Sequence, residues 1–254
     1  MHHSYLDKYA RHDSLLHRLD ARVKTLLAMA AVISIASMAK PGVLFFAALL
    51  ILIAILYALA RIPLAYLLTR SAIILPFSLF AAVTLAFSTR FSGAFWEWGG
   101  LTLTAEGVNR AAALLLRSFA AVSFMILLIN TTPFDQLLRA LRWMKIPNLF
   151  ALLLSFFYRY LYLLWDERER IQRARDVRYF GGRWTRQIAL TGNLAASLFL
   201  RSYERAERVQ KAMLSRGWDG NARMRGSRTW EQKDSTALLW GTLILCTLWL
   251  IHRI

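Results

Sequence analysis

The chain has 254 residues, 57% of them hydrophobic, with nine tryptophans, and its formal net charge is +17. A mean hydropathy of +0.39 is too high for an ordinary soluble domain and indicates a protein of the lipid bilayer. The single cysteine, Cys246, excludes a disulfide framework and a cysteine-based metal cluster.

Five apolar runs approach the roughly 20 residues that a helix needs to cross a hydrocarbon core. They are 23–39, 43–60, 71–87, 111–130 and 236–251. The first two read as a membrane hairpin around Lys40-Pro41-Gly42, and Pro76 is expected to kink the third. The fold class is therefore an all-α integral membrane protein with about five transmembrane helices.

A long charged section with helical periodicity, 131–235, separates the first four apolar runs from the last. The expected domains are thus an N-terminal membrane domain over 1–130, a charged helical domain over 131–235, expected in the cytoplasm, and a C-terminal transmembrane helix over 236–254. The charged section opens with a short amphipathic helix, Pro133–Lys145.

Two long helices are predicted next, at about 147–180 and 185–216. Each would be roughly 45 to 50 Å long at the rise of an α-helix. Their first halves are apolar and their second halves charged. Each could therefore root in the membrane through its first half and project a polar tip.

The segment 146–165 is long enough to span the membrane, but basic clusters flank it on both sides and Arg159 interrupts it. A spanning helix would carry one cluster across the bilayer. We therefore expect this helix to lie at the inner membrane surface.

The distribution of lysine and arginine predicts the orientation. If the N-terminus, the 61–70 loop and 131–235 are cytoplasmic, 27 of the 32 basic residues lie on that side. This asymmetry favours a cytoplasmic N-terminus. It also explains the charge without a nucleic-acid partner.

Two stretches of the charged section repeat one another. Residues 169–182, ERIQRARDVRYFGG, and 207–220, ERVQKAMLSRGWDG, are identical at six of fourteen positions in register. Each copy ends in an arginine, an aromatic residue and a glycine, as the end of a helix often does. Arg178 and Arg216 are equivalent, so two similar tips imply two similar sockets, as a pair of identical partner subunits would supply.

The common catalytic motifs do not occur in this sequence. It contains no P-loop, no H-E-x-x-H and no G-x-S-x-G motif, and its histidines do not cluster. We therefore expect no enzyme activity, no metal site and no cofactor in this chain. Arg117, within the fourth apolar run, is either a functional cation or a snorkelling one.

Ser215-Arg216-Gly217, within KAMLSRGWDG and after RSYERAERVQ, resembles the second Ala-Arg-Gly motif of the transmembrane (T) components of energy-coupling factor (ECF) transporters. The opening LDARVK resembles the start of their cobalt-type branch, the CbiQ family. The order of membrane helices and helical cytosolic section agrees along essentially the whole chain.

The resemblance implies a scaffold of an ATP-driven importer in the bacterial inner membrane. Two ABC ATPase subunits (CbiO-like) would bind its coupling helices, and a membrane subunit (CbiM-like), with a small accessory subunit (CbiN-like), would capture cobalt. The ATPase-coupling residues that the resemblance implies all lie in the two repeats. They are Ala174, Arg175, Arg178, Ala212, Ser215, Arg216 and Gly217.

The first motif departs from the family pattern. By letters, Ala174-Arg175-Asp176 is the match, with Asp replacing Gly; by the internal repeat, Arg178 is the equivalent of Arg216. We favour Arg178, because equivalent sockets should receive equivalent positions.

Other functions fit parts of the same pattern. The scaffold could serve nickel or a vitamin, because the substrate site is expected in a partner. A chain of another class, a basic membrane adaptor, would instead bind anionic lipid or RNA without transport.

Overall fold

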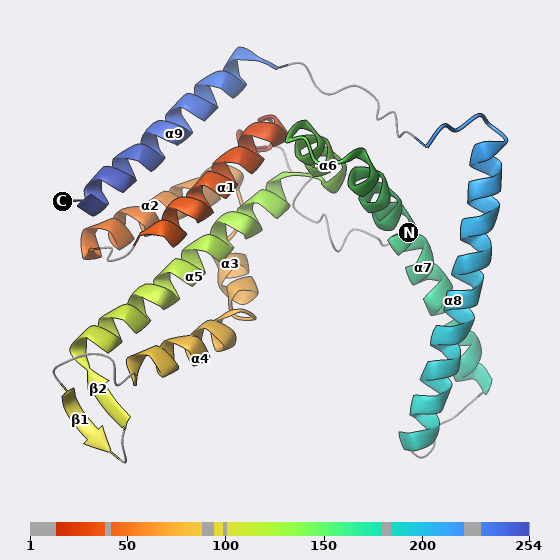
Figure 1. The fold of residues 1–254 in the computed structure, drawn as a ribbon, viewed down its shortest axis with the longest axis horizontal. Coiled ribbons are helices and arrows are strands. Elements are labelled where there is room, and N and C mark those ends of the chain that lie inside the picture. Colours follow the sequence, from red (N-terminus) through yellow and green to blue (C-terminus); the bar gives the residue numbers. More distant parts are fainter. Residues whose placement is uncertain are drawn as a thin grey trace. The chain divides into compact units, whose positions relative to one another are not determined.

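A computed structural model describes residues 14–38, 42–87, 94–98, 101–178, 184–220 and 230–253 (Figure 1). These residues form two units, one of 14–140 with 230–253 and the other of 141–220. Both units are almost entirely helical, as the sequence predicts.

The first unit contains one short hairpin among its helices. Its helices are α1 (Ala21–Ser37), α2 (Val43–Ala60), α3 (Leu64–Ser71), α4 (Leu75–Ala86), α5 (Ala105–Thr131), α9 (Gln232–Arg253) and most of α6 (Phe134–Trp143). The antiparallel strands β1 (Ala94–Trp98) and β2 (Leu101–Thr104), which the sequence analysis did not predict, lead directly into α5. Thr104 begins that helix, because its hydroxyl accepts the Gly107 amide at 3.1 Å.

The core of the first unit forms around α2. Phe45, Leu49 and Tyr57 of this helix are its largest fully buried side chains. The Tyr57 hydroxyl donates to the Ser123 carbonyl of α5 at 2.9 Å, which satisfies the phenol away from water. The opposite side of α2 exposes leucine and isoleucine side chains, as expected of a helix that faces lipid.

Two described helices, α5 and α7 (Asn148–Arg178), have the length and hydropathy of a membrane span, and the pair α2 and α3, bent by 119°, would be a third. The count of about five spans therefore remains a prediction. The position of 146–165 at the membrane surface also remains a prediction. Most of this segment belongs to α7, which has the length and composition of a spanning helix.

The third apolar run differs from its prediction. Pro76 does not kink a continuous helix; it lies in the first turn of α4, which is only 12 residues long. Proline lacks an amide hydrogen, so the first turn of a helix is the place where it costs least.

The LDARVK motif, residues 19–24, forms hydrogen bonds with the ends of helices that are far apart in sequence. Asp20 caps α1 by accepting the Arg22 amide at 2.8 Å, and its own amide donates to Asp234 of α9 at 2.9 Å. The fully buried Asp234 also accepts the Glu231 amide at 3.1 Å. The first and last helices of the unit are thus joined through one carboxylate.

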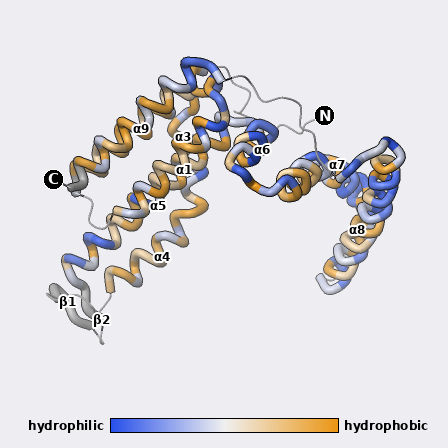
Figure 2. The backbone as a smooth tube through the Cα atoms, turned by 45° about the horizontal axis from the view of Figure 1, so that its top comes forward, coloured by the Kyte–Doolittle hydropathy of each residue, from blue (hydrophilic) through white to orange (hydrophobic). Residues whose placement is uncertain are grey.

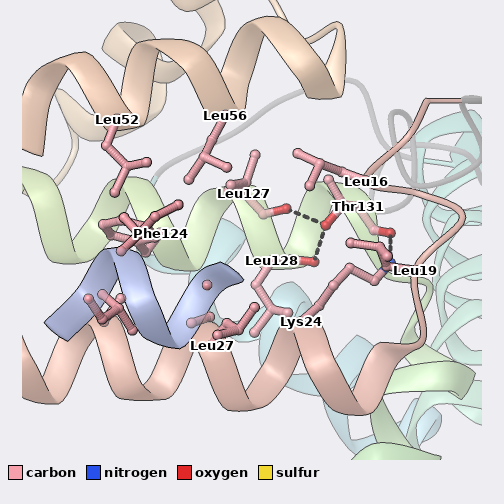
Figure 3. A pocket seen from close by; sticks show the side chains of 15 residues that line it. Leu16, Leu19, Lys24, Leu27, Leu52, Leu56, Phe124, Leu127, Leu128 and Thr131 are labelled. Atoms are coloured by element: carbon pink, nitrogen blue, oxygen red, sulfur yellow. Dashed lines mark hydrogen bonds between the residues drawn. The ribbon is translucent and has the colours of Figure 1, made fainter. Parts of the chain in front are cut away.

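Lys24 of the same motif closes the end of α5. Its ammonium group donates to the Thr131 carbonyl at 2.7 Å, at the helix end where a cation is favoured (Figure 3). Beside it lies an apolar cavity of about 130 Å³ among α1, α2, α5 and α9. Leucines line most of this cavity, so the lysine is held at its polar edge.

The second unit consists mainly of α7 and α8 (Trp184–Leu214). The bounds agree with the sequence prediction to within two residues. Hydrophobic residues predominate along α4 and α9 of the first unit, whereas hydrophilic residues interrupt α8 (Figure 2). In their described residues, α7 buries only Ala151 and α8 buries none.

Candidate functional site

The helices α7 and α8 run antiparallel where they meet. One cleft between them is lined by 163–170 of α7 and 198–208 of α8, and a second by 170–178 and 190–201. The charged half of α7 therefore lies beside the apolar half of α8. The sequence analysis expected both charged halves to project as similar tips; the antiparallel course instead separates them.

The two repeated arginines consequently lie far apart along the pair. Arg178 lines the same cleft as Leu190 and Asn193, whereas Arg216 follows the opposite end of α8. The intervening 23 to 26 residues correspond to roughly 35 to 40 Å of helix. Both arginines are exposed. Two exposed cations at this separation can each meet a different subunit.

The second tip has a well-defined helix end. Gly217 has φ +75°, and its amide donates to the Leu214 carbonyl at 2.9 Å. The Trp218 amide donates to the Met213 carbonyl at 3.1 Å, which completes a Schellman cap. Arg216 directly precedes the left-handed glycine, so the cap holds its backbone at the tip of the helix.

Small residues surround Arg216. Ala212 lies one turn earlier and is exposed, and the Ser215 hydroxyl donates to the Lys211 carbonyl at 2.9 Å. These short side chains leave the guanidinium group of Arg216 accessible. A planar guanidinium suits a socket of carboxylates or helix carboxyl ends.

The first tip distinguishes its two candidate arginines. Arg175 donates through Nε and Nη2 to Asp176 at 2.9 and 2.8 Å, so the residue in the place of the family's glycine engages it. Arg178 is the last residue of α7. Ala174 is exposed one turn before it, and the rest of the first repeat, 179–182, lies outside the described residues.

One interaction between the two helices has no counterpart in the sequence analysis. Glu167 of α7 accepts hydrogen bonds from Arg201 of α8 and, at 3.1 Å, from Arg170 of its own helix. The hydrogen bond from Arg201 is the main cause of the lowered pKa of Glu167, which partial burial opposes. The carboxylate is therefore ionised at neutral pH.

The sequence carried only part of the signal for this pair, namely the opposite charges of Glu167 and Arg201. Glu167 lies 11 residues before the end of α7, whereas Arg201 lies 17 residues after the start of α8. Pairing residues at equal distances from the connection would therefore have missed this ion pair, and finding it required the folded chain.

The remaining site features are neutral on function. Arg117 is half-buried in α5, which is compatible both with a functional cation and with one that snorkels to the membrane surface. Within the described residues, no group of three or more His, Cys, Asp or Glu side chains could hold a metal ion.

Comparison with known proteins decides the family. The pattern of the CbiQ family, described as a cobalt transport protein, matches residues 12–226. The chain belongs to the CbiQ family.

Relatives of this CbiQ protein agree over nearly its whole length. The energy-coupling factor transporter transmembrane protein EcfT of Limosilactobacillus fermentum is 30% identical over 258 residues, 95% of this chain and 94% of its own. The EcfT of Staphylococcus aureus is 27% identical over 246 residues, 92% and 91% of the two chains. This CbiQ protein is thus a multi-pass T component of an ECF transporter, as the motifs predict.

A third relative is a fusion. A putative fused cobalt transport protein CbiMQ of Methanocorpusculum labreanum is 30% identical over 232 residues, which are 86% of this chain and 38% of the relative. The region shared with this CbiQ protein is therefore one part of a longer chain there.

Proposed function

We propose that this T component couples ATP hydrolysis by two partner ABC ATPase subunits to the uptake of cobalt ion through a membrane subunit that captures the ion. The observation that carries the proposal is the pair of exposed arginine tips, Arg178 and Arg216, on equivalent repeat positions at opposite ends of a helix pair. Two like tips suit a dimer of like ATPases.

Cobalt is the substrate that the comparisons favour. The family description names cobalt transport, and so does the name of the fused relative. That name joins CbiM to CbiQ, which supports a CbiM-like capture subunit as the second partner. In this proposal the protein lies in the bacterial inner membrane with its N-terminus in the cytoplasm.

Movement would pass through the helix pair. When ATP draws the two ATPases together, the tips seated in them approach each other, and α7 and α8 move with them. An arginine buried in a protein interface commonly contributes about 2 kcal/mol or more. Losing one tip should weaken ATPase binding by roughly 30-fold.

The test replaces both tip arginines with alanine. In proteoliposomes holding the full complex, R178A/R216A should abolish ATP-dependent cobalt uptake while the protein still inserts into the membrane. The control is R173A/K211A, which removes one cation from each of the same two helices, also at equivalent repeat positions. Normal uptake by R178A/R216A would refute the proposal.

Single substitutions identify the contact at the first tip. R178A should lower the affinity for the ATPase pair by roughly 30-fold. R175A should lower it less, because Asp176 already engages the Arg175 side chain. Binding of the purified ATPases to each variant measures the difference, and the reverse order would assign the contact to Arg175.

A further inference from the structure

The ion pair between Glu167 and Arg201 lies at the crossing of α7 and α8. The Glu167 side chain is 15% exposed, whereas Arg201 and Arg170, which both bind its Oε1 atom, are 54% and 70% exposed. The carboxylate thus lies between the helices, and both arginines reach it from the surface.

Apolar packing restrains this crossing only weakly. In the described residues of the unit, α8 has no buried side chain, and two leucines that line the cleft with the pair, Leu164 and Leu198, are only half-buried. Leucine contacts are not directional, so by themselves they allow helices to slide and rotate. A charge-assisted hydrogen bond has a required distance and angle. It therefore fixes the register of the crossing.

A small change of angle at the ion pair displaces both arginine tips, because each tip lies several helical turns away from it. Arg178 lies 11 residues beyond Glu167 on α7, about 16 Å along the axis, and Arg216 lies 15 residues beyond Arg201, about 22 Å. A rotation of about 10° at the crossing would move each tip by roughly 3 to 4 Å. That displacement is about the length of a hydrogen bond or more, so a loose crossing would misplace the arginines in their sockets.

We propose that Glu167 is a positioning residue: its ion pair with Arg201 sets the angle at which α7 and α8 cross, and hence the separation of the two arginine tips. The role in transport rests on the proposed function above. The role in geometry does not, since it concerns two helices of this chain alone.

The first measurement is the distance between the helix ends. The full-length protein, with Cys246 replaced by serine, carries spin labels at V177C and Q210C, both exposed positions outside the implied coupling residues. Pulsed electron resonance on the assembled complex in nanodiscs gives the distance distribution. E167Q and R201Q should each broaden this distance distribution, and the charge swap E167R/R201E should narrow the distribution again.

A matched control separates the crossing from loss of charge. R170Q removes the other arginine that binds the same Glu167 oxygen, but that arginine belongs to α7 itself. Its distance distribution should match that of the parent protein. R201Q breaks the same bond from the α8 side, so a folding defect peculiar to position 167 cannot account for the result.

The second measurement is the number of cobalt ions transported per ATP hydrolysed. E167Q and R201Q should lower this ratio at least about fivefold, the lower end of usual coupling between sites. ATPase activity should persist, and the swap should restore the ratio. An unchanged distance distribution in E167Q overturns the role of Glu167 in geometry. A broadened distribution with an unchanged ratio of cobalt to ATP overturns its role in transport. Normal uptake by R178A/R216A would instead refute the proposed function, so the two failures are distinguishable.

Discussion

At the scale of single residues, Gly217 controls where Arg216 lies. Its φ of +75° is a conformation that side chains with a Cβ rarely adopt, and nothing lies within 4 Å of the position where a Cβ would be added. The requirement for glycine therefore comes from the backbone alone.

Replacing Gly217 with alanine should loosen the second tip. The left-handed conformation costs about 1 to 2 kcal/mol for a residue with a Cβ, and G217N should cost less because asparagine tolerates it. Amide hydrogen exchange at 217 and 218 measures the opening of the cap. The control is G192A within α8, which should slightly stabilise its helix. Equal protection in G217A and the parent would show that the cap does not need glycine.

At the scale of the elements, one carboxylate holds α1 and α9 of the first unit together. Asp234 accepts amides from Asp20 and Glu231, and it is fully buried. Leaving the buried Asp20 amide without an acceptor costs about 1 to 3 kcal/mol, and the part-buried Glu231 amide costs less. This contact explains the acidic residue at position 234, whereas the carboxylate of Asp20 serves to cap α1 through the Arg22 amide.

We therefore expect D234A to destabilise the protein by roughly 1 to 4 kcal/mol, and D234N by less, because its amide oxygen can still accept. Thermal unfolding in detergent, compared with the parent, gives the difference. The exposed pair of Asp135 and Arg139 supplies the control, since D135A should cost under about 1 kcal/mol. A D234A protein as stable as D135A would contradict the role of this carboxylate.

At the scale of the whole molecule, the distribution of charge predicts which parts face the cytoplasm. Most basic residues follow α5 or precede α1, and a bilayer admits such clusters on one side far more readily than it lets them cross. The same argument opposes a transmembrane course for 146–165, although α7 is long and apolar enough for one.

Cysteine labelling decides between these courses. In a C246S background, K145C and R168C bracket the segment, and both should react with a membrane-impermeant reagent added from the cytoplasmic side alone. G42C, in the turn expected on the outside, should react only from the other side. Labelling of K145C and R168C from opposite sides would mean that the segment spans the membrane.

Much of this protein follows from its sequence alone. The long helices of 131–235 were located to within two residues, because proline, glycine and the change from apolar to charged residues act locally on helix ends. The repeat and its motifs likewise predicted the CbiQ family, since a family pattern lies in the order of residues. The coupling role of the two tips remains a prediction.

Only the tertiary structure decided how these parts meet. The antiparallel course of α7 and α8, the Glu167–Arg201 ion pair and the Asp20–Asp234 contact join residues 34 to 214 positions apart. Local periodicity records which face of a helix is apolar, but not which other helix covers it. The separation of the two arginine tips depends on that choice of neighbour, so it became visible only in the folded chain.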